Sequence, residues 1–68
     1  MTIYLKLARK DLVLLQYLLE GYEGISSITT IDAREAIVRI MIIPDFQDDF
    51  QIILSELKIS VDFRIVQS

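Results

Sequence analysis

The carboxylates of Asp45, Asp48 and Asp49 are the densest group of chemically active side chains in the sequence. Grouped carboxylate oxygens can hold a hard cation. The same spacing is also typical of the start of a helix, where Asp45 would be the N-cap and Asp48 would complete a capping box. Acidic residues also suit the positive end of the helix dipole. We favour this structural role over cation binding and predict no metal site.

Arg9 and Lys10 are the second candidate, because they follow the first predicted strand and open the first predicted helix. Backbone N–H groups at such a position favour anions. Arg9 and Lys10 are therefore our candidate ligand-binding residues, with a solvated turn as the alternative.

Enzymatic chemistry has little support, because the chain contains no histidine and no cysteine. Its serines have no imidazole to activate them, and no thiol can act as a nucleophile. The two glycines form no phosphate-binding loop. We predict a protein that is not an enzyme, with no catalytic residues and no cofactor.

The periodicity of the apolar residues predicts six elements. Residues 2–8 alternate between apolar and polar side chains, which is typical of a half-buried strand. Leucines at helical spacing predict a helix over 9–22, which Gly21 and Gly24 end, since either can take the left-handed conformation. The remaining expected elements are strands at 25–32, 36–43 and 61–66 and a helix from Asp45 to Lys58.

One predicted strand is irregular. Ile25, Ile28 and Ile31 recur every third residue, and this period fits neither face of a strand. An edge strand with a β-bulge would explain the spacing.

The element order βαββαβ predicts one α+β domain over residues 1–68, of ferredoxin-like type. Right-handed crossovers place both helices on one face of a four-stranded antiparallel sheet, with strand order 4-1-3-2. So small a domain has a marginal core, and without disulfides it commonly relies on a partner chain.

The other face of the predicted sheet would remain partly apolar. Its interface candidates are Tyr4, Ile37, Arg39, Met41 and Ile43. A contiguous apolar patch indicates a contact surface; partial cover by Lys and Arg stems is the alternative.

Two further surfaces could make contacts. Val13 and Tyr17 lie off the apolar stripe of the first helix and form either a second interface or an ordinary surface pair. The strand at 25–32 has no Pro or Lys to block pairing of its edge with another chain.

The net charge of −3 argues against nucleic acid as a partner. RNA binding would also need more exposed aromatic side chains than Tyr4 on the central strands. Basic residues nevertheless gather on the predicted open face, at Lys6, Arg39 and Arg64. They are either solvated or suited to an anionic partner, including an acidic helix of another chain. The acidic residues of the helices and their ends are Asp11, Glu20, Glu23, Asp45, Asp48, Asp49 and Glu56.

No apolar run approaches the length of about 18 residues that a membrane span needs. The first residues also lack the features of a signal peptide. We therefore expect a cytoplasmic protein with no membrane partner.

The segments Arg9-Lys10-Asp11, Glu20-Gly21-Tyr22-Glu23-Gly24 and Thr29-Thr30-Ile31-Asp32 resemble a small bacterial family known only as a domain of unknown function. The topology is also similar to that of ACT-type regulatory domains, which bind amino acids between paired copies. That resemblance implies pairing, but the usual loop glycine is replaced here by the run from Ala8 to Asp11.

These observations leave two functional hypotheses. The first is an oligomerisation or protein-interaction module, present as a homo-oligomer or bound to another protein. The alternative is an ACT-like sensor that binds a small molecule at a subunit interface near Arg9 and Lys10.

Overall fold

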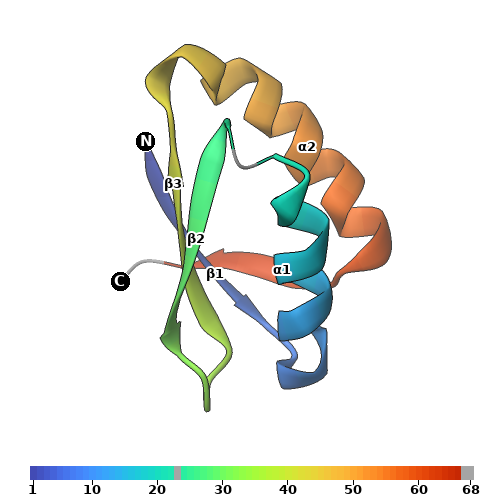
Figure 1. The fold of residues 1–68 in the computed structure, drawn as a ribbon. Helices are drawn as coiled ribbons and strands as arrows, with labels where there is room; N and C mark the ends of the chain where they lie inside the picture. Colours follow the sequence, from blue (N-terminus) through green and yellow to red (C-terminus); the bar gives the residue numbers. More distant parts are fainter. Residues whose placement is uncertain (23, 67–68) are drawn as a thin grey trace.

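The computed structural model describes residues 1–22 and 24–66. The chain forms two α-helices and a four-stranded antiparallel sheet, the α+β fold that the sequence predicts (Figure 1). Glu23, which belongs to one of the motifs above, lies outside the described residues. The elements in chain order, with η for a 3₁₀ turn, are β1 (Thr2–Leu7), η1 (Arg9–Asp11), α1 (Leu12–Glu20), β2 (Ser26–Asp32), β3 (Ile37–Ile42), η2 (Pro44–Phe46), α2 (Gln47–Ser60) and β4 (Phe63–Val66).

The strands are arranged in the order β2-β3-β1-β4, and each neighbouring pair is antiparallel. The central strands β1 and β3 place Leu5 opposite Val38, and β4 places Ile65 opposite Leu5. Because side chains alternate along a strand, this register puts all three residues on the same face of the sheet.

β2 is an edge strand, and the predicted bulge is confirmed. Its pairing with β3 shifts between Thr30 and Asp32, so that Ile31 has no partner in the register. The inserted residue changes the phase of the side-chain alternation, because a bulge places two residues opposite one.

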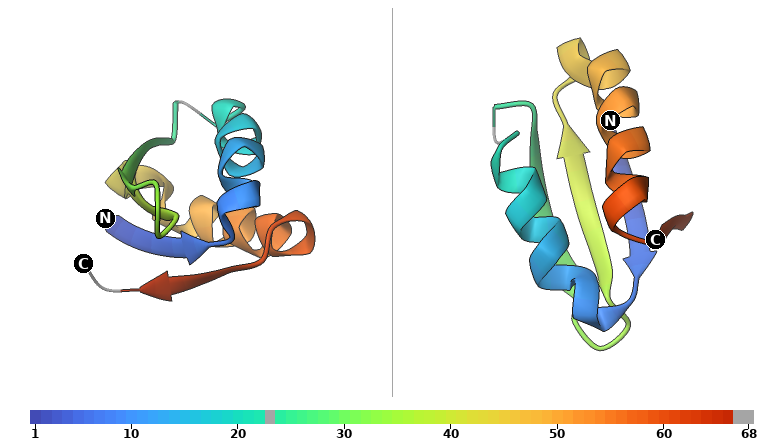
Figure 2. Two further views of the ribbon diagram at one scale, coloured as in Figure 1. Left: turned by 90° about the horizontal axis from the view of Figure 1, so that it is seen from below. Right: turned by 90° about the vertical axis from the view of Figure 1, so that its right-hand side faces the viewer.

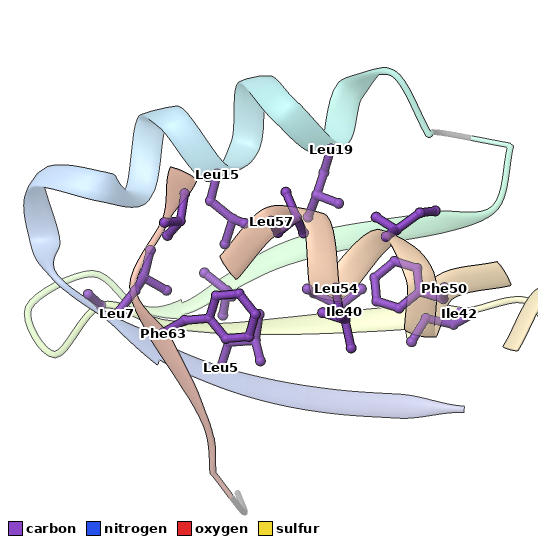
Figure 3. Packing of buried hydrophobic residues seen from close by; sticks show 14 residues of the cluster. Leu5, Leu7, Leu15, Leu19, Ile40, Ile42, Phe50, Leu54, Leu57 and Phe63 are labelled. Carbon is purple, nitrogen blue, oxygen red and sulfur yellow. The ribbon is translucent and has the colours of Figure 1, made fainter. Parts of the chain in front are cut away.

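Both helices cover the same face of the sheet (Figure 2). They share a single core with the strands, in which Leu5, Leu15, Val38, Ile40 and Phe50 have no exposed surface (Figure 3). Burying one such side chain contributes about 1.5–3 kcal/mol. The helices lie on one side of the sheet, and no element formed by residues 1–22 and 24–66 covers its opposite face.

The first helix differs from its prediction at both ends. The segment 9–22 begins with the tight turn η1, in which the Asp11 N–H donates to the Ala8 carbonyl at 2.9 Å, and α1 starts only at Leu12. Gly21 ends α1 as its C-cap, as predicted, but its φ is −68°, and neither it nor Gly24 has the positive φ of the left-handed conformation. The chain leaves the helix through a further turn, in which the Tyr22 N–H donates to the Leu19 carbonyl at 2.9 Å.

The predicted N-cap at Asp45 was also wrong. Asp45 lies inside η2, and α2 begins at Gln47 with Phe46 as its N-cap and no side-chain capping bond. Pro44 explains the difference, since its fixed φ starts a 3₁₀ turn before the helix. Asp48 and Asp49 still lie in the first turn of α2, where their negative charges interact favourably with the positive end of the helix dipole.

The turn between β2 and β3 contains the only positive φ found among the described non-glycine residues. Ala36 has a φ of 55° and is fully buried, so β3 begins at Ile37 and not at Ala36 as predicted. Asp32 organises the turn, because its Oδ1 accepts the N–H groups of Arg34 at 3.0 Å and Glu35 at 3.1 Å.

The last strand starts later than predicted. Val61 is buried but extended, and its N–H donates to the Leu57 carbonyl at 2.8 Å, so it ends α2 and β4 begins at Phe63. Ile65 shares the helix-covered face with Leu5, yet it remains 62% exposed. Its position on an edge strand that runs away from the end of α2 explains this exposure (Figure 2).

Candidate functional site

The uncovered side of the sheet, which we call the open sheet face, is built from three rows of side chains. Alternation along β1 and β3 directs Leu5, Val38 and Ile40 into the core and the intervening residues away from it. The strand register then aligns these residues across the sheet. The rows are Ser27, Met41 and Thr2; Thr29, Arg39, Tyr4 and Val66; and Asp32, Ile37, Lys6 and Arg64.

Arg39 lies near the centre of the open sheet face, opposite Tyr4 on one side and Thr29 on the other. Its Nε is buried and has no hydrogen-bond partner among the described residues. A buried donor without an acceptor costs about 1–3 kcal/mol. Among the described residues, an unsatisfied group therefore lies in the middle of this surface.

Lys6 is the basic residue of this face whose charge is compensated. Its Nζ lies 2.9 Å from a carboxylate oxygen of Glu35 and donates to the Glu35 carbonyl at 2.8 Å. This ion pair ties β1 to the β2–β3 turn. Arg39 and Arg64 therefore account for the remaining positive charge of the open sheet face.

The structure brings together Tyr4, Ile37, Arg39 and Met41, the candidates predicted for this face. Met41 is 51% exposed, whereas Tyr4 and Ile37 are half-buried by their neighbours. Ile43 lies just beyond β3, where it borders a shallow hollow of about 390 Å³. The hollow is lined by Ser26, Ser27, Met41, Ile42, Ile43 and Pro44.

Val13 and Tyr17, the other two predicted interface residues, lie in the other layer of the molecule. They project from α1 on the side opposite the core residues Leu15 and Leu19. The structure therefore separates the predicted interface residues into two surfaces.

Two exposed isoleucines of α2 were not among the residues predicted from the sequence. Ile52 and Ile59 are seven residues apart and lie opposite the buried side of this helix. Their helical spacing, off the stripe of buried residues, was the signal that could have identified them. With Val13 and Tyr17 they define what we call the outer helix face, on which these four side chains keep 63–87% of their surface exposed.

The candidate ligand residues Arg9 and Lys10 are both exposed and lie in the single turn η1. A hollow of about 310 Å³ opens nearby, where β1 ends and β4 begins. Its lining residues are Lys6, Leu7, Ala8, Asp62, Phe63 and Arg64. The basic pair predicted from the sequence is thus not part of the lining of this hollow.

Asp45, Asp48 and Asp49 do not converge on a common point. Within residues 1–22 and 24–66, no group of three or more acidic side chains is placed to hold a metal ion. In the same part of the chain, neither helix combines the length and the apolar character that crossing a membrane requires.

The fold and its surfaces define a small α+β domain with one sheet face left uncovered. The chain belongs to the family described as domain of unknown function (DUF4911), whose model matches residues 5–61. The matched segment runs from within β1 to just past the end of α2, so it includes both helices, β2, β3 and the last part of β1. The comparisons with curated proteins and with solved structures found no match for this chain.

Proposed function

We propose that this chain is a non-enzymatic oligomerisation or protein-interaction module that binds its partner through the open sheet face. The observation that carries the proposal is the unsatisfied Nε of Arg39 in the centre of that face, beside the exposed apolar surface of Met41. A partner that covers the face would remove apolar surface from water and provide an acceptor for Arg39.

The size of the domain supports the same proposal. With 68 residues and no cysteine, the chain has neither a large core nor disulfides to stabilise it. Burial of the open sheet face would add to the core from the other side of the sheet. The absence of histidine and cysteine from the sequence supports a role without catalysis.

Sedimentation velocity over a range of micromolar concentrations tests this proposal. We expect the wild-type chain to self-associate and Met41→Glu to weaken the association at least about 10-fold, because one buried apolar side chain is removed. Ile65→Glu is the matched control. Ile65 is another exposed apolar strand residue, but it lies on the opposite side of the sheet. A wild-type chain that stays monomeric, or equal effects of both substitutions, would contradict the proposal.

A second candidate function is an ACT-like sensor that binds an amino acid or a similar small ion. It is supported by the hollow between β1 and β4, which is lined by charges of both signs from Lys6, Asp62 and Arg64. A thermal-shift screen with amino acids, nucleotides and inorganic anions tests this function. A ligand at 100 times its Kd would stabilise the fold by about 2.7 kcal/mol, whereas unchanged melting temperatures would exclude it.

We also propose a ferredoxin-like classification and a cytoplasmic location. The classification is supported by the element order and by the strand order β2-β3-β1-β4, which reads 4-1-3-2 from the other edge. The location is supported by the absence of cysteine, since small domains of oxidising compartments are commonly rich in disulfides.

A further inference from the structure

The molecule carries two exposed apolar surfaces, one on each of its layers. The open sheet face presents Met41 and the half-buried Tyr4 and Ile37. The outer helix face presents Val13 and Tyr17 from α1 and Ile52 and Ile59 from α2. Figure 2 shows the two helices side by side on the far side of the sheet from the open face. A single contact between like faces would cover one of these surfaces and leave the other in water.

The helices also form a groove that could receive side chains. A hollow of about 210 Å³ lies between α1 and α2. Its lining residues are Leu18, Tyr22, Ile53, Glu56, Leu57 and Ser60. The helix layer that carries the outer helix face therefore also contains a hollow between its two helices.

The two faces differ in the sign of their charge. On the helix side, the exposed acidic residues are Glu20, Asp45, Asp48, Asp49 and Glu56. The exposed basic residues there are Arg9 and Lys10, in η1, and Lys58, whose Nζ donates to the Phe63 carbonyl. On the open sheet face, Lys6 is paired with Glu35 and Asp32 is bound to backbone N–H groups of its turn. Lys6, Arg39 and Arg64 outnumber the carboxylates of Asp32 and Glu35 and leave that face basic, whereas acidic residues outnumber basic ones on the helix layer.

These observations distinguish the ways in which two copies can meet. Sheet against sheet would bring Arg39 and Arg64 near their own counterparts, and helices against helices would oppose acidic residues. Like charges in close contact are unfavourable and suppress such pairings. The unlike pairing opposes arginines to carboxylates and covers apolar surface on both sides of the contact.

Resting on the proposed function, we infer that the occupant of the open sheet face is the outer helix face of a second copy of this chain. Carboxylates of α2 in one copy accept hydrogen bonds from Arg39 of the next, and Tyr17 and Ile52 pack beside Met41. The contact is heterologous, so it repeats from copy to copy and produces a closed ring or an open stack. Every sheet inside such an assembly has helices on both faces.

Two variants test the inference by complementation. The sheet-face variant, Met41→Glu with Arg64→Glu, removes apolar surface and repels the acidic helices. The helix-face variant, Tyr17→Lys with Ile52→Lys, removes apolar surface and repels the basic sheet. All four side chains are exposed, and far-UV circular dichroism checks that both variants keep the wild-type fold.

Each variant alone is expected to sediment as a monomer, with self-association weakened about 100-fold or more by the two apolar and charge changes. Mixed in equal amounts, they are expected to form a one-to-one complex, because one retains its helix face and the other its sheet face. A chain that carries all four substitutions is the matched control. This control is expected to stay monomeric, both alone and mixed with either double variant. The measurement is made at roughly 0.5 M salt, where screening strongly reduces ionic contacts between the introduced charges.

Three results would contradict the contact between the open sheet face of one copy and the outer helix face of the next, while leaving self-association intact. The helix-face variant could retain the wild-type assembly, which would indicate sheet-to-sheet pairing. The sheet-face variant could retain it, which would indicate pairing through the helices. The mixture could also fail to form a complex when the wild-type chain assembles. A wild-type chain that is monomeric by itself would instead contradict the proposed function.

Discussion

Replacing Arg39 with methionine should stabilise the isolated chain and weaken its assembly. Methionine keeps most of the length of the arginine stem but has no N–H group. It therefore removes the buried Nε that has no partner among the described residues, while an unbranched apolar side chain stays between Tyr4 and Thr29, the neighbours of Arg39 in the strand register. The two expected effects have opposite signs, which distinguishes this prediction from simple damage to the fold.

The structure sets the expected magnitude. A buried donor without an acceptor costs about 1–3 kcal/mol. Arg39 as a whole is only partly buried, so the lower end of this range applies and we expect a gain of about 1 kcal/mol. In a domain of this size, such a gain raises the melting temperature by about 4–8 °C.

Urea unfolding followed by far-UV circular dichroism measures this change, at a concentration low enough for the monomer to dominate. Arg64→Met is the matched control, since Arg64 is an exposed arginine of the same face. Its effect on the free energy of unfolding should stay within about 0.5 kcal/mol. Sedimentation velocity of the same two variants then reports the effect on assembly.

The reasoning would be refuted if Arg39→Met lowered the free energy of unfolding by 1 kcal/mol or more. That result would mean that Nε is satisfied in the isolated chain, or that the guanidinium supports the fold. A stabilised variant that assembles as tightly as the wild-type chain would keep the stability argument but remove Arg39 from the contact.

Three further predictions concern the fold. Asp32→Ala should lower the free energy of unfolding by about 1 kcal/mol because two turn N–H groups lose their acceptor, whereas Asp32→Asn should retain most of it in thermal unfolding. Phe50→Ala should cost about 3–5 kcal/mol, close to the whole stability of a domain this small, so the helical circular dichroism signal should be largely lost; a cooperative unfolding transition near the wild-type midpoint would contradict this. Lys58→Met should cost about 1 kcal/mol in urea unfolding, because the ammonium donates to the Phe63 carbonyl and lies 4.4 Å from the centroid of the Phe63 ring. Lys10→Met, in an exposed turn, is the control for that change and should have no measurable effect.

The interior of the fold was predictable because apolar periodicity depends on local geometry. Alternation around Leu5 and Val38 predicted strands with one buried face, and these residues are fully buried. The irregular spacing of Ile28 and Ile31 predicted the bulge, since a register shift must disturb a period of two.

The ends of the elements were less predictable. Asp45 has the composition of an N-cap, but Pro44 starts a 3₁₀ turn earlier and moves Asp45 inside it. Gly21 could have ended α1 with a positive φ, but its φ is −68°. Among the described non-glycine residues, Ala36 has the only positive φ, and it lies in the turn before β3. Such choices depend on where the next strand must start, which local composition does not contain.

The candidate site divides in the same way. Side chains alternate between the two faces along β1 and β3, so the sequence was enough to assign Tyr4, Arg39 and Met41 to the open sheet face. The isolation of the Arg39 Nε could not, because it depends on how the neighbouring strands pack around one atom. Ile52 and Ile59 were visible as a helical pair, but their meaning depends on the acidic residues around them.

The sequence by itself determined the class of fold, the buried faces of β1 and β3 and the absence of histidine and cysteine from the chain. These properties follow from residue types and short-range periodicity, which act through neighbouring positions in the chain. Only the tertiary structure decided that the Arg39 Nε, without a partner among the described residues, lies at the centre of one layer, and that exposed apolar residues with acidic neighbours lie on the other. Both facts arise from residues that are distant in sequence and are brought together only when the sheet and the helices pack around a common core.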